Sequence, residues 1–202
     1  MKLRYSPTSP YVRKVSVVAI EAGLADKIEQ IPTNVWDPET DIASSNPLGK
    51  VPALETPDGK LLFDSPVICE YLDSLHDKNK LFPPTGEDRW HALRWQALAD
   101  GILDAAILRL LEGKREKDKQ SASWIGRQKI SMQRGLDRLE AEVDDFSGLV
   151  NIGTLTIAIM LDYIDLRFPD DNWRKGRPAL ADWYETMASR PSMMTTVPKD
   201  PG

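Results

Sequence analysis

The feature that most constrains the fold of this chain is a change of pattern between residues 77 and 87. Before it, strand-like and helix-like segments alternate: "KLRY" predicts a strand, "YVRKVSVVAIEA" a helix and "KIEQIP" a second strand. After it, every apolar pattern has helical spacing. The sequence therefore predicts an α/β part followed by an all-α helical part.

The rest of the α/β part contains a loop, a hairpin and one more helix. The polar stretch "TNVWDPETDIASSNPLGK" predicts a loop with one short helix, and "VPALETPDGKLLF" predicts a hairpin. "DSPVICEYLDSL" follows with helical spacing. In both helices a serine directly precedes a proline. We therefore expect Ser9 and Ser65 to be N-caps, since proline suits the first helical position.

Charge and two prolines in "HDKNKLFPPTGED" predict a linker. The expected domains are residues 1–77, a linker at 78–87, and a helical domain at 88–202. We expect a single helix over residues 121–146, a central buried helix in "IGTLTIAIMLDYIDLRF", and a last helix that begins at Pro178. Asn151 is placed to cap the buried helix, with Thr154 at the third helical position.

Composition excludes several classes of protein. The net charge of -5 provides no general attraction for nucleic acid, and no run of ~18 apolar residues could span a membrane. The first residues lack the apolar core of a secretory signal. The single cysteine, Cys69, permits no intrachain disulfide, and with His76 and His91 alone it argues against a metal centre. We expect a cytoplasmic protein without metal.

Four stretches carry a resemblance to a known family: "SPTSPYVRK", "NPLGKVPAL", "FDSPVICEYL", and "LADG" together with "RPALADWYETMASRPS". Their order and spacing resemble the cytosolic glutathione S-transferases, most closely the bacterial members whose first helix begins with Ser-Pro. The resemblance covers nearly the whole chain. It implies a thioredoxin-like first domain, a helical second domain that lines the pocket for the second substrate, glutathione as co-substrate, a role in detoxification, and a homodimer. One departure is Thr154, where the family often has aspartate.

Glutathione offers a thiol and two carboxylates, and helix N-termini favour anions. We hypothesise that Ser9 contacts the sulfur as the catalytic residue. Lowering a thiol pKa of about 8.5 by ~2 units needs roughly 2.7 kcal/mol. A hydrogen bond to a charged acceptor supplies about 1.5–3 kcal/mol, and the helix end about 0.3–1 kcal/mol. The alternatives are that Ser9 only caps the helix, or that Thr8 contacts the sulfur.

The resemblance implies further glutathione contacts. The bond between Val51 and Pro52 is cis in the family, and the backbone of the residue before the proline pairs with the cysteinyl unit. Lys50 would reach a glutathione carboxylate. The alternatives are a trans proline that starts a strand and a solvated lysine.

At the second Ser-Pro pair, the Ser65 hydroxyl and the first N–H groups of its helix would take the γ-glutamyl carboxylate. Asp64 would accept from the α-ammonium of that residue. The alternatives are capping only for Ser65 and a surface turn for Asp64.

Three functions follow. The first is a transferase that binds glutathione and attacks a small, apolar electrophile, with peroxide reduction as a side activity. The second is a glutathione-transferase-like binding or assembly module without catalysis. The third, a cysteine-dependent disulfide reductase, is disfavoured because Ser9 occupies the thiol position.

Two other sets of residues are interpreted as structural. Asp100 and Asp104 lie on one helix face, and two acids so placed usually form a solvated surface. Cys69 is interpreted as a small core residue.

Overall fold

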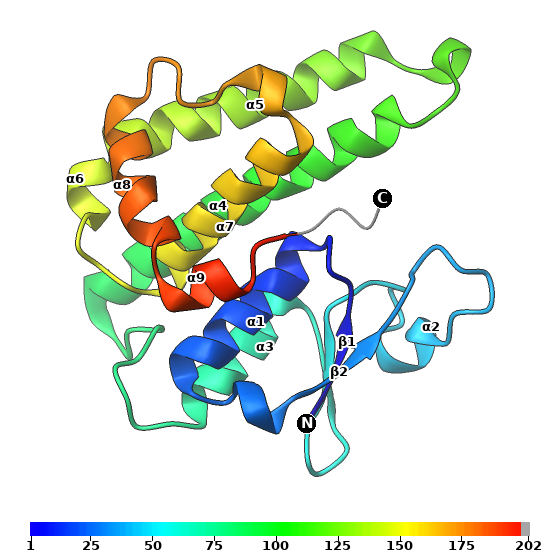
Figure 1. Cartoon of the computed structure of the whole chain (residues 1–202), viewed down its shortest axis with the longest axis vertical. Coiled ribbons are helices and arrows are strands. Elements are labelled where there is room, and N and C mark those ends of the chain that lie inside the picture. The colour runs from blue at the N-terminus through cyan, green and yellow to red at the C-terminus, as the bar shows by residue number, and fades with distance from the viewer. Residues whose placement is uncertain (199–202) are drawn as a thin grey trace. The chain divides into compact units, whose positions relative to one another are not determined.

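The computed structural model describes residues 1–198. These residues form two compact units (Figure 1). The first contains Met1–Pro84 and the segment that begins at Pro191, and the second is Thr85–Arg190. The expected domain ranges put the segment after Pro191 in the helical part, whereas its contacts are with the first unit.

The first unit is built on a mixed sheet with the strand order β2-β1-β3-β4. The strands are β1 (Lys2–Tyr5), β2 (Glu29–Pro32), β3 (Ala53–Glu55) and β4 (Leu61–Leu62). β1 pairs with β2 in parallel, and β3 is antiparallel to both β1 and β4. With its helices, this is a thioredoxin-like domain, so the expected fold class is confirmed.

Side chains on the strands alternate between the two faces of the sheet, and different helices lie on each face. Leu3 on β1 and Leu54 on β3 are buried in the core of the unit, which also contains the packed pair α1 (Pro10–Ala22) and α3 (Ser65–Ser74). Arg4 points to the opposite face, because neighbouring strand residues alternate. There it pairs with Asp41, the N-cap of the short α2 (Ile42–Ser45).

The two Ser-Pro helices do not begin in the same way. Ser9 is the N-cap of α1, as expected, and its Oγ accepts from the Val12 N–H at 3.3 Å. The expectation for Ser65 is wrong, because Asp64 is the N-cap of α3 and Ser65 is its first helical residue. Both arrangements are compatible with proline, since the first helical N–H groups have no partner within the helix.

A short helix that the sequence pattern did not reveal, α9 (Pro191–Thr195), packs on α1. Ser192 Oγ donates to Glu21 Oε1 at 2.5 Å, and Arg13 Nη2 donates to the Met193 carbonyl at 3.3 Å. The chain therefore returns to the first unit after the helical unit ends.

The second unit contains helices and no strand among its described residues, as expected. Its helices are α4 (Gly86–Gly113), α5 (Ala122–Ala141), α6 (Val143–Phe146), α7 (Ile152–Arg167) and α8 (Pro178–Ala188), with short 3₁₀ turns at Lys117–Lys119 and Pro169–Asp171. α8 begins at Pro178, as predicted. No helix within residues 1–198 has the length and apolarity required to cross a bilayer.

The expectation of one helix over residues 121–146 is wrong, because the helix stops at Glu142 and restarts as α6. Glu142 is only 4% exposed, and its carboxylate accepts from Arg94 Nη1 at 3.0 Å and from Trp95 Nε1 at 2.9 Å. These donors on α4 hold residue 142 in a turn conformation, with φ -110° and ψ 7°, at which the two helices meet.

The central helix of the second unit is α7, as predicted. Asn151 Oδ1 accepts from the Thr154 N–H at 3.0 Å, and Thr154 Oγ1 accepts from the Asn151 N–H at 3.0 Å. The predicted capping box is therefore complete with threonine. Gly153 lets α7 approach α4 closely, because a Cβ there would lie 2.5 Å from the Ala92 carbonyl oxygen.

Candidate functional site

The candidate site lies at one edge of the sheet in the first unit. β3 runs antiparallel to both β1 and β4, with Arg4 opposite Ala53 and Leu54 opposite Leu62. The carboxyl ends of β1 and β4 therefore meet the amino end of β3 at the same edge. Ser9 follows β1, Val51 precedes β3 and Asp64 follows β4. The sheet thus directs three separate segments of expected site residues to one edge.

The turn before α1 holds the two candidate hydroxyls. The Ser9 N–H donates to the Ser6 carbonyl at 3.2 Å, which tightens the turn directly after β1. Ser9 Oγ accepts from Val12, so its hydroxyl hydrogen can still donate to another acceptor. Thr8 Oγ1 lies 3.5 Å from Ser6 Oγ. Both hydroxyls are half-buried at the start of α1.

The start of α3 has the chemistry of an anion site. Its N-cap, Asp64, makes no side-chain cap bond, so the first N–H groups of the helix are not satisfied by this carboxylate. Asp64 is exposed, while Ser65 is only 1% exposed. The two residues therefore combine an accessible carboxylate with an enclosed hydroxyl at the positive end of a helix dipole.

The segment that carries Lys50 and Val51 is held by a residue that the sequence reasoning did not select. Asn46 is 2% exposed, its Nδ2 donates to the Lys50 carbonyl at 2.8 Å, and its Oδ1 accepts from the Leu48 N–H at 3.0 Å. An asparagine before a proline is a turn signature, and "NPLGK" carries that signal. The Val51–Pro52 peptide bond is cis, as expected, and so is the Phe63–Asp64 bond.

The same loop is tied to the sheet at its other end. The Arg4 guanidinium hydrogen-bonds the Asp41 carboxylate and holds the pKa of that carboxyl below its ordinary value. Arg4 belongs to β1 and Asp41 caps α2, which leads into the segment that contains Asn46. The backbone at Lys50 and Val51 is therefore supported from two sides.

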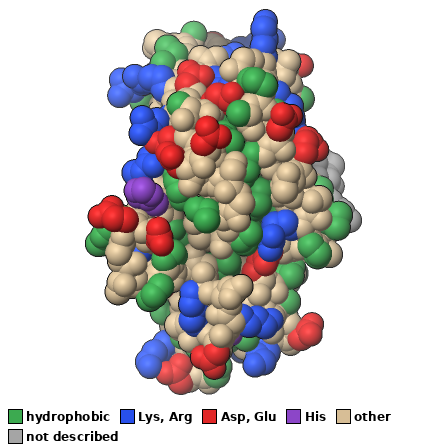
Figure 2. All heavy atoms as spheres, turned by 90° about the vertical axis from the view of Figure 1, so that its left-hand side faces the viewer, with side chains coloured by type: hydrophobic (Ala, Val, Ile, Leu, Met, Phe, Trp, Pro, Cys, Tyr) green, Lys and Arg blue, Asp and Glu red, His purple; other side chains and the backbone are tan. Residues whose placement is uncertain are grey.

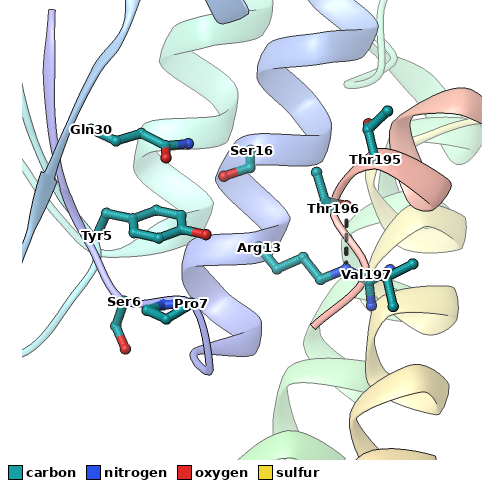
Figure 3. Close-up of a pocket in the computed structure, with 9 residues that line it drawn as sticks. All are labelled: Tyr5, Ser6, Pro7, Arg13, Ser16, Gln30, Thr195, Thr196 and Val197. Atoms are coloured by element: carbon teal, nitrogen blue, oxygen red, sulfur yellow. Dashed lines mark hydrogen bonds between the residues drawn. The ribbon is translucent and has the colours of Figure 1, made fainter. Parts of the chain in front are cut away.

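A separate cavity of about 280 Å³ lies in the first unit between β1, β2, α1 and the end of α9 with the residues that follow it (Figure 3). It shares the turn residues Ser6 and Pro7 with the region before Ser9. Its lining does not include Ser9, Lys50, Val51, Asp64 or Ser65. The cavity is therefore adjacent to the expected glutathione site and is not the same place.

The remaining candidates have ordinary surroundings. Cys69 is fully buried in α3, and Asp104 is exposed on α4. Within residues 1–198 no three His, Cys, Asp or Glu side chains come together as a metal site would require. Acidic and basic side chains are interspersed on the face drawn in Figure 2.

Comparison with known proteins identifies the family. Residues 8–75 match the glutathione S-transferase N-terminal domain. The chain is 36% identical over 202 residues to an uncharacterized GST-like protein, YibF, from Escherichia coli K12, which covers 98% of both chains. This chain belongs to the glutathione S-transferase family.

Two similar solved structures contain bound glutathione. A glutathione transferase family member from Pseudomonas fluorescens Pf-5, solved with bound glutathione, has a TM-score of 0.94 and 39% identity, covering 98% of this chain and 99% of that one. A glutathione S-transferase from Methylobacillus flagellatus KT, also with glutathione bound, has a TM-score of 0.93 and 37% identity over 98% and 99% of the two chains.

Proposed function

We propose that the protein is a glutathione transferase that binds glutathione, stabilises its thiolate and directs it at a small electrophile. The observation that carries this proposal is the meeting of the α1 start, the amino end of β3 and the α3 start at one edge of the sheet. The family relationship, with relatives solved in complex with glutathione, supports the choice of ligand.

In this proposal each segment binds one part of the tripeptide. Asp64 accepts from the α-ammonium of the γ-glutamyl unit, and Ser65 with the first N–H groups of α3 takes its carboxylate. The backbone of Val51 pairs with the cysteinyl unit. Lys50, which is exposed, reaches a carboxylate of the tripeptide. Asn46 is a positioning residue because it fixes the Lys50 carbonyl.

The chemical step is assigned to Ser9. Its hydroxyl donates to the sulfur and favours the thiolate, a contribution of about 1.5–3 kcal/mol to which the start of α1 adds about 0.3–1 kcal/mol. This range is comparable with the roughly 2.7 kcal/mol that lowering a thiol pKa by two units requires. Thr8 is the alternative donor, since its hydroxyl lies in the same turn.

We further propose a cytoplasmic homodimer that serves in detoxification, with peroxide reduction as a secondary reaction. The competing proposal, a binding or assembly module without catalysis, requires the glutathione contacts to be lost. Lys50, Val51, Asp64 and Ser65 retain the chemistry those contacts need. This favours the enzyme.

The test is calorimetric titration of the wild-type protein with glutathione, followed by turnover of 1-chloro-2,4-dinitrobenzene. We expect a dissociation constant of about 1 mM or tighter, in the ordinary range for enzyme substrates, and saturable formation of the thioether. No binding at millimolar glutathione would contradict the transferase and favour the assembly module. Glutathione binding without turnover of aryl halides or peroxides would contradict the assigned chemistry and leave only the ligand.

A further inference from the structure

The cavity beside the candidate glutathione site has a polar lining. It is bounded by β1 and β2 on one side and by α1 and the end of α9 with the residues that follow it on the other. Its lining consists of Tyr5, Ser6, Pro7, Arg13, Ser16, Gln30, Thr195, Thr196 and Val197. Among these described residues Arg13 is the one charged side chain. An apolar ligand would leave most of these polar groups facing it without a partner.

Arg13 is built into the wall of the cavity. It is 6% exposed, its Nε donates to Thr196 Oγ1 at 3.3 Å, and its Nη2 donates to the Met193 carbonyl at 3.3 Å. Figure 3 shows its side chain extending from α1 toward the segment after α9. These two hydrogen bonds hold the guanidinium in place beside the cavity that it lines.

Two further donors face the same space. Figure 3 shows the Tyr5 hydroxyl directed toward α1 and the Gln30 amide directed toward Ser16. Over the described part of the chain, neither the Tyr5 hydroxyl nor the Gln30 amide has a hydrogen-bond partner in the structure. A phenol, an amide and a guanidinium around one space are donors suited to a carboxylate.

The cavity also adjoins the turn that carries the proposed sulfur contact. Ser6 and Pro7 line it, and the Ser6 carbonyl accepts from the Ser9 N–H, so one turn connects the cavity wall to the proposed sulfur contact. Its volume of about 280 Å³ is close to the lower end of the roughly 300–1,000 Å³ of small-molecule sites. It therefore fits a small group and not a second tripeptide.

We propose that this cavity binds the carboxylate of the second substrate, so that the preferred electrophile is a small organic acid and not a wholly apolar compound. This inference rests on the proposed function. The reaction itself is unchanged: the glutathione thiol gives its proton to solvent, the sulfur forms a bond to carbon, and the leaving group departs with its electron pair. The carboxylate takes no part in bond formation and serves only for recognition.

The test uses a matched pair of electrophiles, 4-chloro-3-nitrobenzoate and 4-chloro-3-nitrobenzamide, and their glutathione conjugates. In each reaction the carbon–chlorine bond breaks and chloride leaves. We expect the wild-type protein to bind the carboxylate conjugate about tenfold more tightly than the amide conjugate in calorimetry, a difference typical of one charge-assisted hydrogen bond. We expect kcat/KM to favour the benzoate in the same direction.

Substitutions at Gln30 test the location without disturbing the core, because this side chain is exposed. Gln30→Lys should increase the preference for the carboxylate conjugate about threefold, and Gln30→Glu should reduce it by a similar factor. Glu29→Gln and Lys27→Gln are the matched controls: they make the same changes of net charge in the same region but do not line the cavity. Neither control should alter the preference.

Arg13→Gln should abolish the preference while leaving the affinity for glutathione unchanged. If this variant does not fold, the Gln30 pair still decides the question. Equal binding of the two conjugates by a wild-type protein that binds glutathione would overturn the carboxylate proposal alone. Identical effects of the Gln30 variants and their controls would overturn the assignment to this cavity. Failure to bind glutathione at all would instead contradict the proposed function.

Discussion

Helices α7 and α3 begin in opposite ways. α7, in the second unit, is closed by its own side chains, because Asn151 and Thr154 satisfy each other's backbone N–H groups. α3, in the first unit, begins at Asp64 without a side-chain cap. A helix start costs stability when its N–H groups lack partners. The difference teaches that α7 closes its start with its own side chains, whereas α3, the start proposed to receive a ligand, keeps its first N–H groups free of a side-chain cap.

The start of α1 is intermediate between these two. Ser9 Oγ accepts from the Val12 N–H, as a cap does, yet its hydroxyl hydrogen can donate elsewhere. The same residue can therefore stabilise the helix and contact a thiolate. On this comparison, substitutions at the three starts should affect three different quantities: turnover at α1, ligand affinity at α3 and folding at α7.

The largest effect is expected at α1. Ser9→Ala should lower kcat by about a hundredfold, because a hydrogen bond to a charged sulfur is worth up to about 3 kcal/mol. The dissociation constant for glutathione should change little, since the carboxylates and the ammonium bind elsewhere. Steady-state kinetics with 1-chloro-2,4-dinitrobenzene and calorimetry measure the two quantities separately.

The neighbouring hydroxyl provides the control for this prediction. Thr8→Val removes a hydroxyl from the same turn but leaves the Ser9 cap intact. It should lower kcat by less than about threefold. A large loss for Thr8→Val together with a small loss for Ser9→Ala would transfer the sulfur contact to Thr8.

The next effect is expected at α3 and concerns affinity. Asp64→Ala should raise the dissociation constant for glutathione by about thirtyfold, because the variant loses the acceptor for the α-ammonium. Asp58→Ala is the matched control, since Asp58 also carries one exposed negative charge in the first unit but lies in the hairpin turn. Equal losses of affinity in the two variants would show that Asp64 acts only through net charge.

At α7 the expected effect is on folding alone. Asn151→Ala should lower the free energy of unfolding by about 1 kcal/mol, the usual contribution of an N-cap. Chemical denaturation measures this change, and calorimetry should find unchanged affinity for glutathione in the folded variant. A loss of affinity as large as that of Asp64→Ala would break the distinction between the two kinds of helix start.

Local patterns were sufficient to predict most of the fold. The turn at residues 57–60 and the apolar run of α7 act through short-range rules, and the hairpin and the helix are where those rules put them. The Ser-Pro pairs located both helix starts to within one residue, since Ser9 caps α1 but Asp64, not Ser65, caps α3. The break at Glu142 and the helix at Pro191–Thr195 were missed. Each depends on a distant partner, Arg94 and Trp95 in one case and α1 in the other.

The residues of the candidate site also fall into those that short motifs predict and those that depend on distant segments. Residues that belong to short motifs, such as Ser9 and Asp64, could be selected from the sequence, although their roles remain proposals. Asn46 carries only the turn signal of Asn-Pro, which does not reveal that its amide donates to the Lys50 carbonyl. Arg13 carries no signal at all, because the cavity that it lines also needs residues of β1, β2 and the C-terminal segment. Such residues are recognisable only when distant segments are brought together.

The smallest expected effect is on the pH dependence of folding stability, and it concerns the break between α5 and α6 in the second unit. The α7 capping box has no titratable group, but the α5–α6 break depends on the Glu142 carboxylate. Burial would raise the pKa of Glu142, yet hydrogen bonds from Arg94 and Trp95 outweigh it and lower the pKa below its ordinary value of 4.5. A lowered folded-state pKa contributes stability that is present above the unfolded value and is lost as the pH falls through the folded value.

Denaturation at a series of pH values below about 4.5 should therefore show a loss of stability that is smaller in Glu142→Gln, because that variant cannot titrate at this position. The control is Glu116→Gln, which removes an exposed carboxylate whose ion pair with Lys119 contributes little. We expect Glu116→Gln to follow the wild-type profile. If Glu142→Gln also follows it, the pairing at the break does not depend on ionised Glu142. The stability of the second unit at low pH would then come from uncharged contacts such as the hydrogen bonds between Asn151 and Thr154.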